Sequence, residues 1–133
     1  MKQEFALDFA PPFVGLENGR FNTIRLGVSW SKRLKPSDEV YIQSSKDKLI
    51  TSKAIVESIE VGTVGELLMC HAADNHNEIN SKDGHEAERL YRYMLKLYGP
   101  HIVNLKKKAT VIYLRIKDDK TIDISKEQTT PSS

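Results

Sequence analysis

The order of strand-like and helix-like segments constrains the fold of this chain more than any other feature of its sequence. Short segments rich in apolar residues, often alternating with polar ones and bounded by Gly, Pro, Asn or Asp, predict β-strands. Helical patterns occur between some of these segments, without a strict alternation of strand and helix. This order predicts a mixed α+β domain. The predicted strands are 5–9, 19–27, 39–42, 49–61 and 109–116, and the predicted helices are 11–18, 64–73 and 84–98.

Two of the predicted helices carry capping signals. In Thr63-Val64-Gly65-Glu66, the threonine can cap the helix start while the glutamate three residues later reaches back to it. Asp83-Gly84-His85-Glu86 repeats the pattern with Asp83 as the cap. Apolar residues at three- and four-residue intervals follow, with Glu88 and Arg92 as a pair on the wet side. We interpret the apolar positions of this helix as core rather than as ligand contacts: Ala87, Leu90, Tyr91, Met94, Leu97 and Tyr98.

Length and composition are typical of a single soluble domain. The chain has 133 residues, of which 39% are hydrophobic and 29% charged. We expect one domain over 1–118 and a polar, disordered tail over 119–133. No apolar run is long enough to span a membrane, and the N-terminus lacks the apolar core of a signal peptide. Cys70 is the only cysteine, which excludes an intrachain disulfide and favours a reducing, cytoplasmic setting. The net charge of +2 permits nucleic-acid binding without arguing for it.

The segment 19–27 places two unlike pairs of side chains on opposite faces of a strand. Ile24 and Leu26 point to one face, and Thr23 and Arg25 point to the other. If the apolar pair enters a core, a hydroxyl and a guanidinium stand side by side on the opposite face. Such a pair can hold an anion or a planar polar ligand, because guanidinium offers a rigid fork of donors. The alternative is a half-solvated strand whose outer face is polar by default.

The long predicted strand 49–61 contains one irregularity. Ile55, Ile59 and Val61 share a face, and Glu57 falls on the same register. A bulge, an edge position or a cleft would each explain a carboxylate there.

The predicted loop 28–37 combines the only tryptophan of the chain with three cations. Trp30 is followed by Lys32, Arg33 and Lys35. An aromatic ring beside cations suits a surface that stacks on a base and contacts phosphates. The alternative is that Trp30 closes one end of a barrel and that the cations are solvated.

Motifs for metal or cofactor chemistry are weak in this sequence. Potential metal ligands gather in sequence at Cys70, His71, Asp74, His76 and His85, but their spacing matches no common zinc pattern. The sequence contains no phosphate-binding loop, no dinucleotide-binding glycine pattern and no nucleophile elbow. We therefore predict no metal and no cofactor.

The run Gly19, Arg20, Thr23, Ile24, Arg25 resembles the signature of the ASCH domains, a branch of the PUA-like β-barrels, in their small single-domain bacterial or phage type. The family pattern has a glycine, then a lysine, then Thr-x-Arg ending on a strand. Thr23 and Arg25 match it in identity and spacing, whereas Arg20 stands at the lysine position. The resemblance covers about residues 5–117. It implies a small β-barrel of about five or six mixed strands with two or three flanking helices.

The resemblance also implies two functions. ASCH domains resemble nucleic-acid or nucleoside binders, which implies an RNA or nucleotide cleft at Arg20, Thr23 and Arg25, with Trp30, Lys32, Arg33 and Lys35 beside it. Some small bacterial members are amidohydrolases that deacetylate acetylated cytidine. Carried over to this sequence, their catalytic residues become Arg20, Thr23 and Asp83, with Glu78 and Glu86 as alternatives to Asp83. Arginine cannot give and take protons as lysine can, which puts hydrolysis in doubt.

Overall fold

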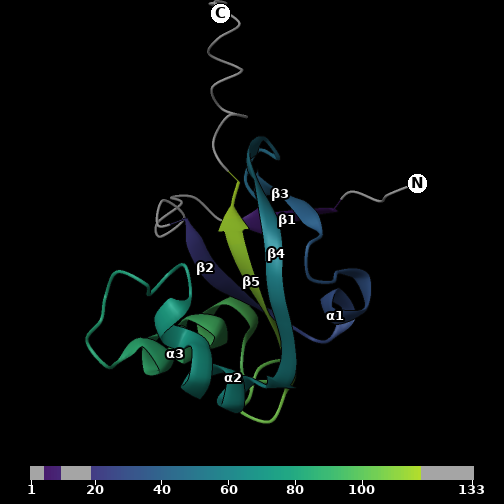
Figure 1. Cartoon of the computed structure of the whole chain (residues 1–133). Helices are drawn as coiled ribbons and strands as arrows, with labels where there is room; N and C mark the ends of the chain where they lie inside the picture. Colours follow the sequence, from purple (N-terminus) through teal and green to yellow (C-terminus); the bar gives the residue numbers. More distant parts are fainter. Residues whose placement is uncertain (1–4, 10–18, 118–133) are drawn as a thin grey trace, which may run out of the picture.

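One five-stranded sheet organises the molecule (Figure 1). The computed structural model describes residues 5–9 and 19–117. Its strands are β1 (Phe5–Phe9), β2 (Arg20–Leu26), β3 (Glu39–Ser44), β4 (Ile50–Thr63) and β5 (Lys108–Ile116). Its helices are α1 (Ser29–Arg33), α2 (Val64–His71), a short 3-10 turn η2 (Ala72–Asp74) and α3 (Glu86–Tyr98). The α+β prediction is confirmed. The predicted helix at 11–18 and the predicted tail at 119–133 lie outside the described residues.

The strands follow the order β1-β3-β4-β5-β2, so β1 and β2 form the two edges of the sheet. β1 pairs with β3 in parallel, and the other neighbouring pairs are antiparallel. The sheet curls into a half-barrel, which brings its two edges toward each other. This architecture matches the small mixed β-barrel that the resemblance implies.

Two apolar clusters lie on opposite faces of the sheet, and β5 contributes to both because it is buried on both sides. Ile112 and Leu114 point into the half-barrel, whereas Val111 and Tyr113 point toward α2 and α3. The inner cluster comprises Leu7, Phe9, Phe21, Leu34, Val40, Ile42, Ala54, Val56, Ile112 and Leu114. The helix-side cluster comprises Val64, Leu67, Leu68, Ala72, Leu90, Met94, Val103, Ala109, Val111 and Tyr113.

Glu57 lies at a bulge. The β4–β5 register shifts between Val56 and Ser58, and β4 has neighbours on both sides, so it is not an edge strand. The bulge turns the Glu57 carboxylate toward two guanidiniums, those of Arg20 (2.6 Å from Nε) and Arg115. A bulge is therefore the explanation that the structure selects.

The structure confirms the capping prediction at Thr63 and contradicts the one at Asp83. Thr63 and Glu66 form the predicted capping box at the start of α2. Asp83 does not cap α3, which begins at Glu86 with His85 in the cap position. The Asp83 carboxylate instead accepts the His85 N–H at 2.9 Å, and this bond holds a turn ahead of the helix.

The predicted loop 28–37 contains a short helix that the pattern did not indicate. Residues Ser29–Arg33 form α1, closed by a bond from the Leu34 N–H to the Trp30 carbonyl. Trp30 packs against the inner cluster and Leu34 belongs to it. Burial of these two apolar side chains stabilises a turn that the local sequence alone would not favour.

Candidate functional site

Thr23 and Arg25 lie side by side on β2, as the alternation predicts. The Arg25 Nε donates to the Thr23 hydroxyl at 3.0 Å, and its Nη2 donates to the Asp8 carbonyl at 2.8 Å. The guanidinium also lies over the Phe9 ring, 5.0 Å from its centroid. Ile24 packs on the opposite side, against the helix-side cluster. Burial lowers the pKa of Arg25, yet an arginine starts so high that it keeps its charge.

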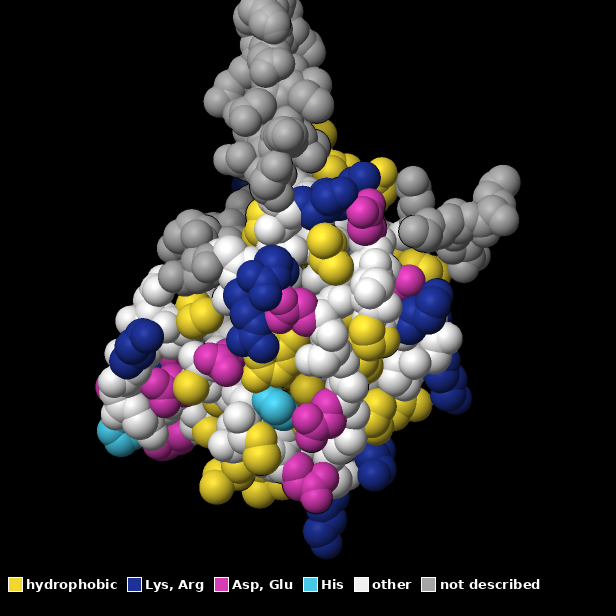
Figure 2. Space-filling model, viewed as in Figure 1, with side chains coloured by type: hydrophobic (Ala, Val, Ile, Leu, Met, Phe, Trp, Pro, Cys, Tyr) yellow, Lys and Arg dark blue, Asp and Glu magenta, His cyan; other side chains and the backbone are white. Residues whose placement is uncertain are grey.

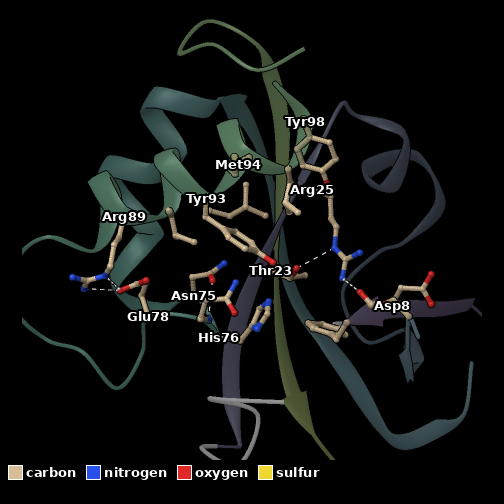
Figure 3. Close-up of a pocket in the computed structure, with 16 residues that line it drawn as sticks. Asp8, Thr23, Arg25, Asn75, His76, Glu78, Arg89, Tyr93, Met94 and Tyr98 are labelled. Atoms are coloured by element: carbon tan, nitrogen blue, oxygen red, sulfur yellow. Dashed lines mark hydrogen bonds and ion pairs between the residues drawn. The ribbon is translucent and has the colours of Figure 1, made fainter. Parts of the chain in front are cut away.

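A cavity of about 750 Å³ opens beside this pair, between the two edges of the sheet and α3 (Figure 3). Arg25 and Asp8 lie at one end, and Glu78 and Arg89 lie at the other. The volume falls in the range of pockets that bind small organic ligands. The described residues that line it are Asp8, Phe9, Thr23, Ile24, Arg25, Ser45, Asn75, His76, Asn77, Glu78, Arg89, Leu90, Tyr93, Met94, Leu97 and Tyr98.

Helix α3 forms the apolar wall of the cavity. Leu90 and Met94 are buried and pack in the helix-side cluster, as predicted for core positions. Leu97 and Tyr98 are about half exposed and line the cavity, so the core interpretation is wrong for these two. They lie near the end of α3, beyond the part that the helix-side cluster covers.

The segment Asn75–Glu78 forms the opposite wall, and sequence reasoning missed it. The His76 N–H donates to the Asn22 carbonyl at 3.0 Å, and the His76 ring packs edge-on against Phe9 at 4.8 Å. Burial, aided by the nearby Arg25 charge, lowers the pKa of His76 to about 4. The imidazole is therefore neutral at pH 7, with one nitrogen as donor and the other as acceptor.

A buried asparagine pair attaches this wall to β2. The Asn22 side chain donates to the His71 carbonyl at 2.9 Å and accepts from the Asn75 side chain at 3.3 Å. Asn75 in turn accepts the Asn77 N–H at 2.9 Å. Both asparagines are almost fully buried, so each bond replaces one that water would otherwise make.

Arg89 gathers the acidic residues that the resemblance suggested. Its Nε and Nη2 bond to one oxygen of Glu78 at 2.9 and 2.7 Å, and two further N–H groups reach Asp83. The Arg89 guanidinium and the His85 N–H lower the pKa of Asp83 to about 2. Glu78 lines the cavity, whereas Asp83 does not. The Glu86 carboxylate accepts the Asp83 N–H at 3.1 Å, so it supports the same turn.

Arg20 lies outside the cavity. An alternating strand directs Arg20 to the face opposite Thr23 and Arg25, where it pairs with Glu57 and lies over Tyr113 at 4.7 Å. The structure therefore brings together Thr23 and Arg25 but not Arg20. On the face of the molecule that Figure 2 shows, basic side chains lie directly beside acidic ones.

The tryptophan and its cations lie at the far end of β1. Trp30 contacts Phe5 edge-on at 5.9 Å, and Arg33 lies 4.2 Å over the Trp30 ring. Lys35 forms an ion pair with Asp38, and Lys32 is exposed. Phe9 at the other end of β1 lines the cavity, and four residue steps of a strand span about 13 Å. None of Trp30, Lys32, Arg33 and Lys35 is among the described residues that line the cavity.

The described part of the chain offers neither a metal-ligand cluster nor a membrane-spanning helix. Within residues 5–9 and 19–117, no group of three or more His, Cys, Asp or Glu side chains could hold a metal ion. Within the same ranges, no helix has both the length and the apolar character needed to cross a bilayer.

The curled half-barrel with its flanking helices has an ASCH-like fold. No protein-family model matches the sequence, and no curated protein matches it. A hypothetical protein, PH0355, superposes with a TM-score of 0.62 at 16% identity, over 86% of this chain and 99% of its own. A mutant of ZmASCH from Zymomonas mobilis superposes with a TM-score of 0.56 at 18% identity, over 86% of this chain and 70% of its own. Identities this low establish the fold, and they confirm the resemblance at that level.

Proposed function

We propose that this chain binds a nucleotide, free or as part of an RNA, in the cavity beside Thr23 and Arg25. One observation carries the proposal: Arg25 lines the cavity with its charge balanced by no ion pair to a described residue. Its partners there are a hydroxyl and a carbonyl, both neutral, and the Asp8 carboxylate pairs with Lys48 at 2.9 Å. A half-buried guanidinium in this position favours an anionic or carbonyl oxygen as its next partner.

The walls of the cavity suit a planar ring. Tyr93 and Met94 face the His76 side of the cavity across its width (Figure 3). Aromatic side chains stack on bases, and neutral amide and imidazole groups bond to base edges. His76 and Asn77 supply such groups here. An ASCH-like fold agrees with this proposal without establishing it.

The cations near Trp30 enter the proposal only for a longer ligand. A strand of RNA would have to leave the cavity and follow β1 for about 13 Å before its phosphates met Lys32, Arg33 or Lys35. Arg33 covers one side of the Trp30 ring, so a base could stack there only on the other side or by displacing Arg33. For a single nucleotide, the proposed contacts are Thr23, Arg25 and the cavity walls.

Calorimetric titration with the ribonucleoside monophosphates tests this proposal. We expect saturable binding that weakens about tenfold in Arg25→Lys, because lysine keeps the charge but loses the fork of donors. Lys32→Ala is the matched control, since it removes a cation outside the cavity and leaves mononucleotide affinity unchanged. Absence of binding at millimolar ligand, or equal affinity of Arg25→Lys and wild type, contradicts the proposal.

The geometry supports binding better than hydrolysis. Of the residues that the resemblance implies for an amidohydrolase, Thr23 and Glu78 share the cavity, while Arg20 and Asp83 lie outside it. The bond that the Thr23 hydroxyl accepts comes from Arg25, which cannot serve as a base. Glu78 is already engaged by Arg89.

The variant Arg20→Lys should therefore release no acetate from acetylated cytidine. Restoring the family lysine changes a residue on the opposite face of β2, which pairs with Glu57. Arg115→Lys provides the matched control, because Arg115 binds the same carboxylate. Acetate release by Arg20→Lys but not by Arg115→Lys, measured by a coupled assay at high enzyme concentration, would restore the hydrolase hypothesis.

A further inference from the structure

The wall that α3 contributes to the cavity changes from buried to exposed along the helix. Leu90 and Met94 are 4% and 7% exposed, whereas Leu97 and Tyr98 are 54% and 50% exposed. All four line the same cavity. The buried pair thus lies inside the cavity and the exposed pair at its mouth, where Tyr98 lies close to Arg25 (Figure 3).

Large apolar side chains gather at this mouth. Tyr93, Leu97 and Tyr98 are all more than 40% exposed, and they lie within two turns of a single helix. Single exposed apolar residues are ordinary, but an apolar group continuous with a cavity indicates a binding surface. Gly99 follows with φ of +84° and ends the helix directly after Tyr98. The aromatic ring therefore stands at the rim with solvent beside it.

A mononucleotide with its phosphate at Arg25 and its base between Tyr93 and His76 would leave the exposed surface of Leu97 and Tyr98 available at the mouth. The remaining surface at Leu97 and Tyr98 is apolar and includes an aromatic ring, which suits a second base rather than a phosphate. A base can stack there only if its face is free. In a duplex both faces are already stacked, so the partner is a single strand.

We propose that the occupant of the cavity is one nucleotide of a single-stranded nucleic acid, and that a neighbouring base stacks on Tyr98 beside Leu97 at the cavity mouth. This inference rests on the function proposed above. It adds a second subsite, and it makes Tyr98 a residue that distinguishes a strand from a free nucleotide.

The test compares each ribonucleoside monophosphate with the homotrinucleotide of the same base. For the base that binds, we expect the trinucleotide to bind about tenfold more tightly, the effect of one added stacking contact. Tyr98→Ala should remove this gain, so that it weakens trinucleotide binding about tenfold more than it weakens mononucleotide binding. Tyr98→Phe should retain the gain, because it keeps the ring. Lys96→Ala should also retain it, since Lys96 lies on α3 outside the lining of the cavity.

The outcomes separate this inference from the proposed function. Equal affinity for mononucleotide and trinucleotide overturns the second subsite alone. Equal losses for both ligands in Tyr98→Ala also overturn it, because Tyr98 would then belong to the inner site. A gain that disappears at high salt assigns the added contact to phosphates and overturns stacking. Failure of both ligands to bind the wild type overturns the second subsite together with the proposed function.

Discussion

Replacing Asn22 with alanine should destabilise the protein by about 3 kcal/mol, because buried polar groups that lose their partners cost about 1 to 3 kcal/mol each. Asn22 is fully buried. Its side chain satisfies the His71 carbonyl and the Asn75 side chain, and alanine would leave both without those bonds. The truncation also leaves a small cavity, which adds to the loss. Because Asn75 belongs to the wall of the cavity, the substitution should loosen that wall as well.

Thermal unfolding followed by circular dichroism measures this effect. A loss of about 3 kcal/mol corresponds to a fall of about 10 °C in Tm for a chain of this size. Asn104→Ala is the matched control, because Asn104 is exposed and makes one local bond to the Lys106 N–H. If Asn22→Ala lowers Tm no more than Asn104→Ala, the buried asparagine pair contributes no more to stability than a hydrogen bond in an exposed turn.

Acidification from pH 7 to pH 4.5 should destabilise the wild type by about 2 to 3 kcal/mol through His76, since each unit of pKa difference is worth 1.36 kcal/mol. Burial holds the folded-state pKa of His76 near 4, whereas a histidine in an unfolded chain titrates near 6.5. Between these values the unfolded state binds the extra proton. Stability is therefore complete above pH 6.5 and falls as the pH drops toward 4.

Urea unfolding across this range isolates the histidine. His76→Gln should flatten the stability profile between pH 6.5 and 4.5, whatever its absolute stability at pH 7. His101→Gln is the control, because His101 is exposed and its replacement should leave the profile unchanged. Carboxylates with lowered pKa, such as Asp8 and Glu57, lose their favourable contacts only at lower pH. Parallel profiles of wild type and His76→Gln would show that His76 is not held neutral.

Much of the fold could be predicted because it depends on local patterns. Alternation along β1 and β5, and the apolar spacing of α3, locate these elements within a residue or two. The same alternation placed Thr23 and Arg25 on one face of β2. It also implies that Arg20 faces the other way, because Arg20 lies three positions from Thr23 and five from Arg25, and both numbers are odd. Arg20 therefore shares its face with Ile24. The family spacing, taken alone, obscured that implication.

The rest of the site depends on contacts between distant parts of the chain. Asp8, His76 and Arg89 enter the cavity through the curl of the sheet and the packing of α3, which no local pattern encodes. The sequence pattern offered His76 only as a metal ligand. Its burial against Phe9 depends on the wall segment docking on β2 through Asn22. The one local signal that could have pointed to this docking was Asn22, a polar residue on the same predicted strand face as Ile24 and Leu26.

The two edges of the sheet meet at the cavity, and side chains rather than a described strand ladder connect them. The Arg25 bond to the Asp8 carbonyl joins β2 to β1, and the Phe9 and Phe21 rings meet edge-on at 6.1 Å. The half-barrel therefore has a seam, which can open without breaking the ladders of the sheet. A ligand that binds both Arg25 and the opposite wall would hold the two edges together at this seam. By mass action, it would make the opening of the half-barrel rarer in proportion to its occupancy.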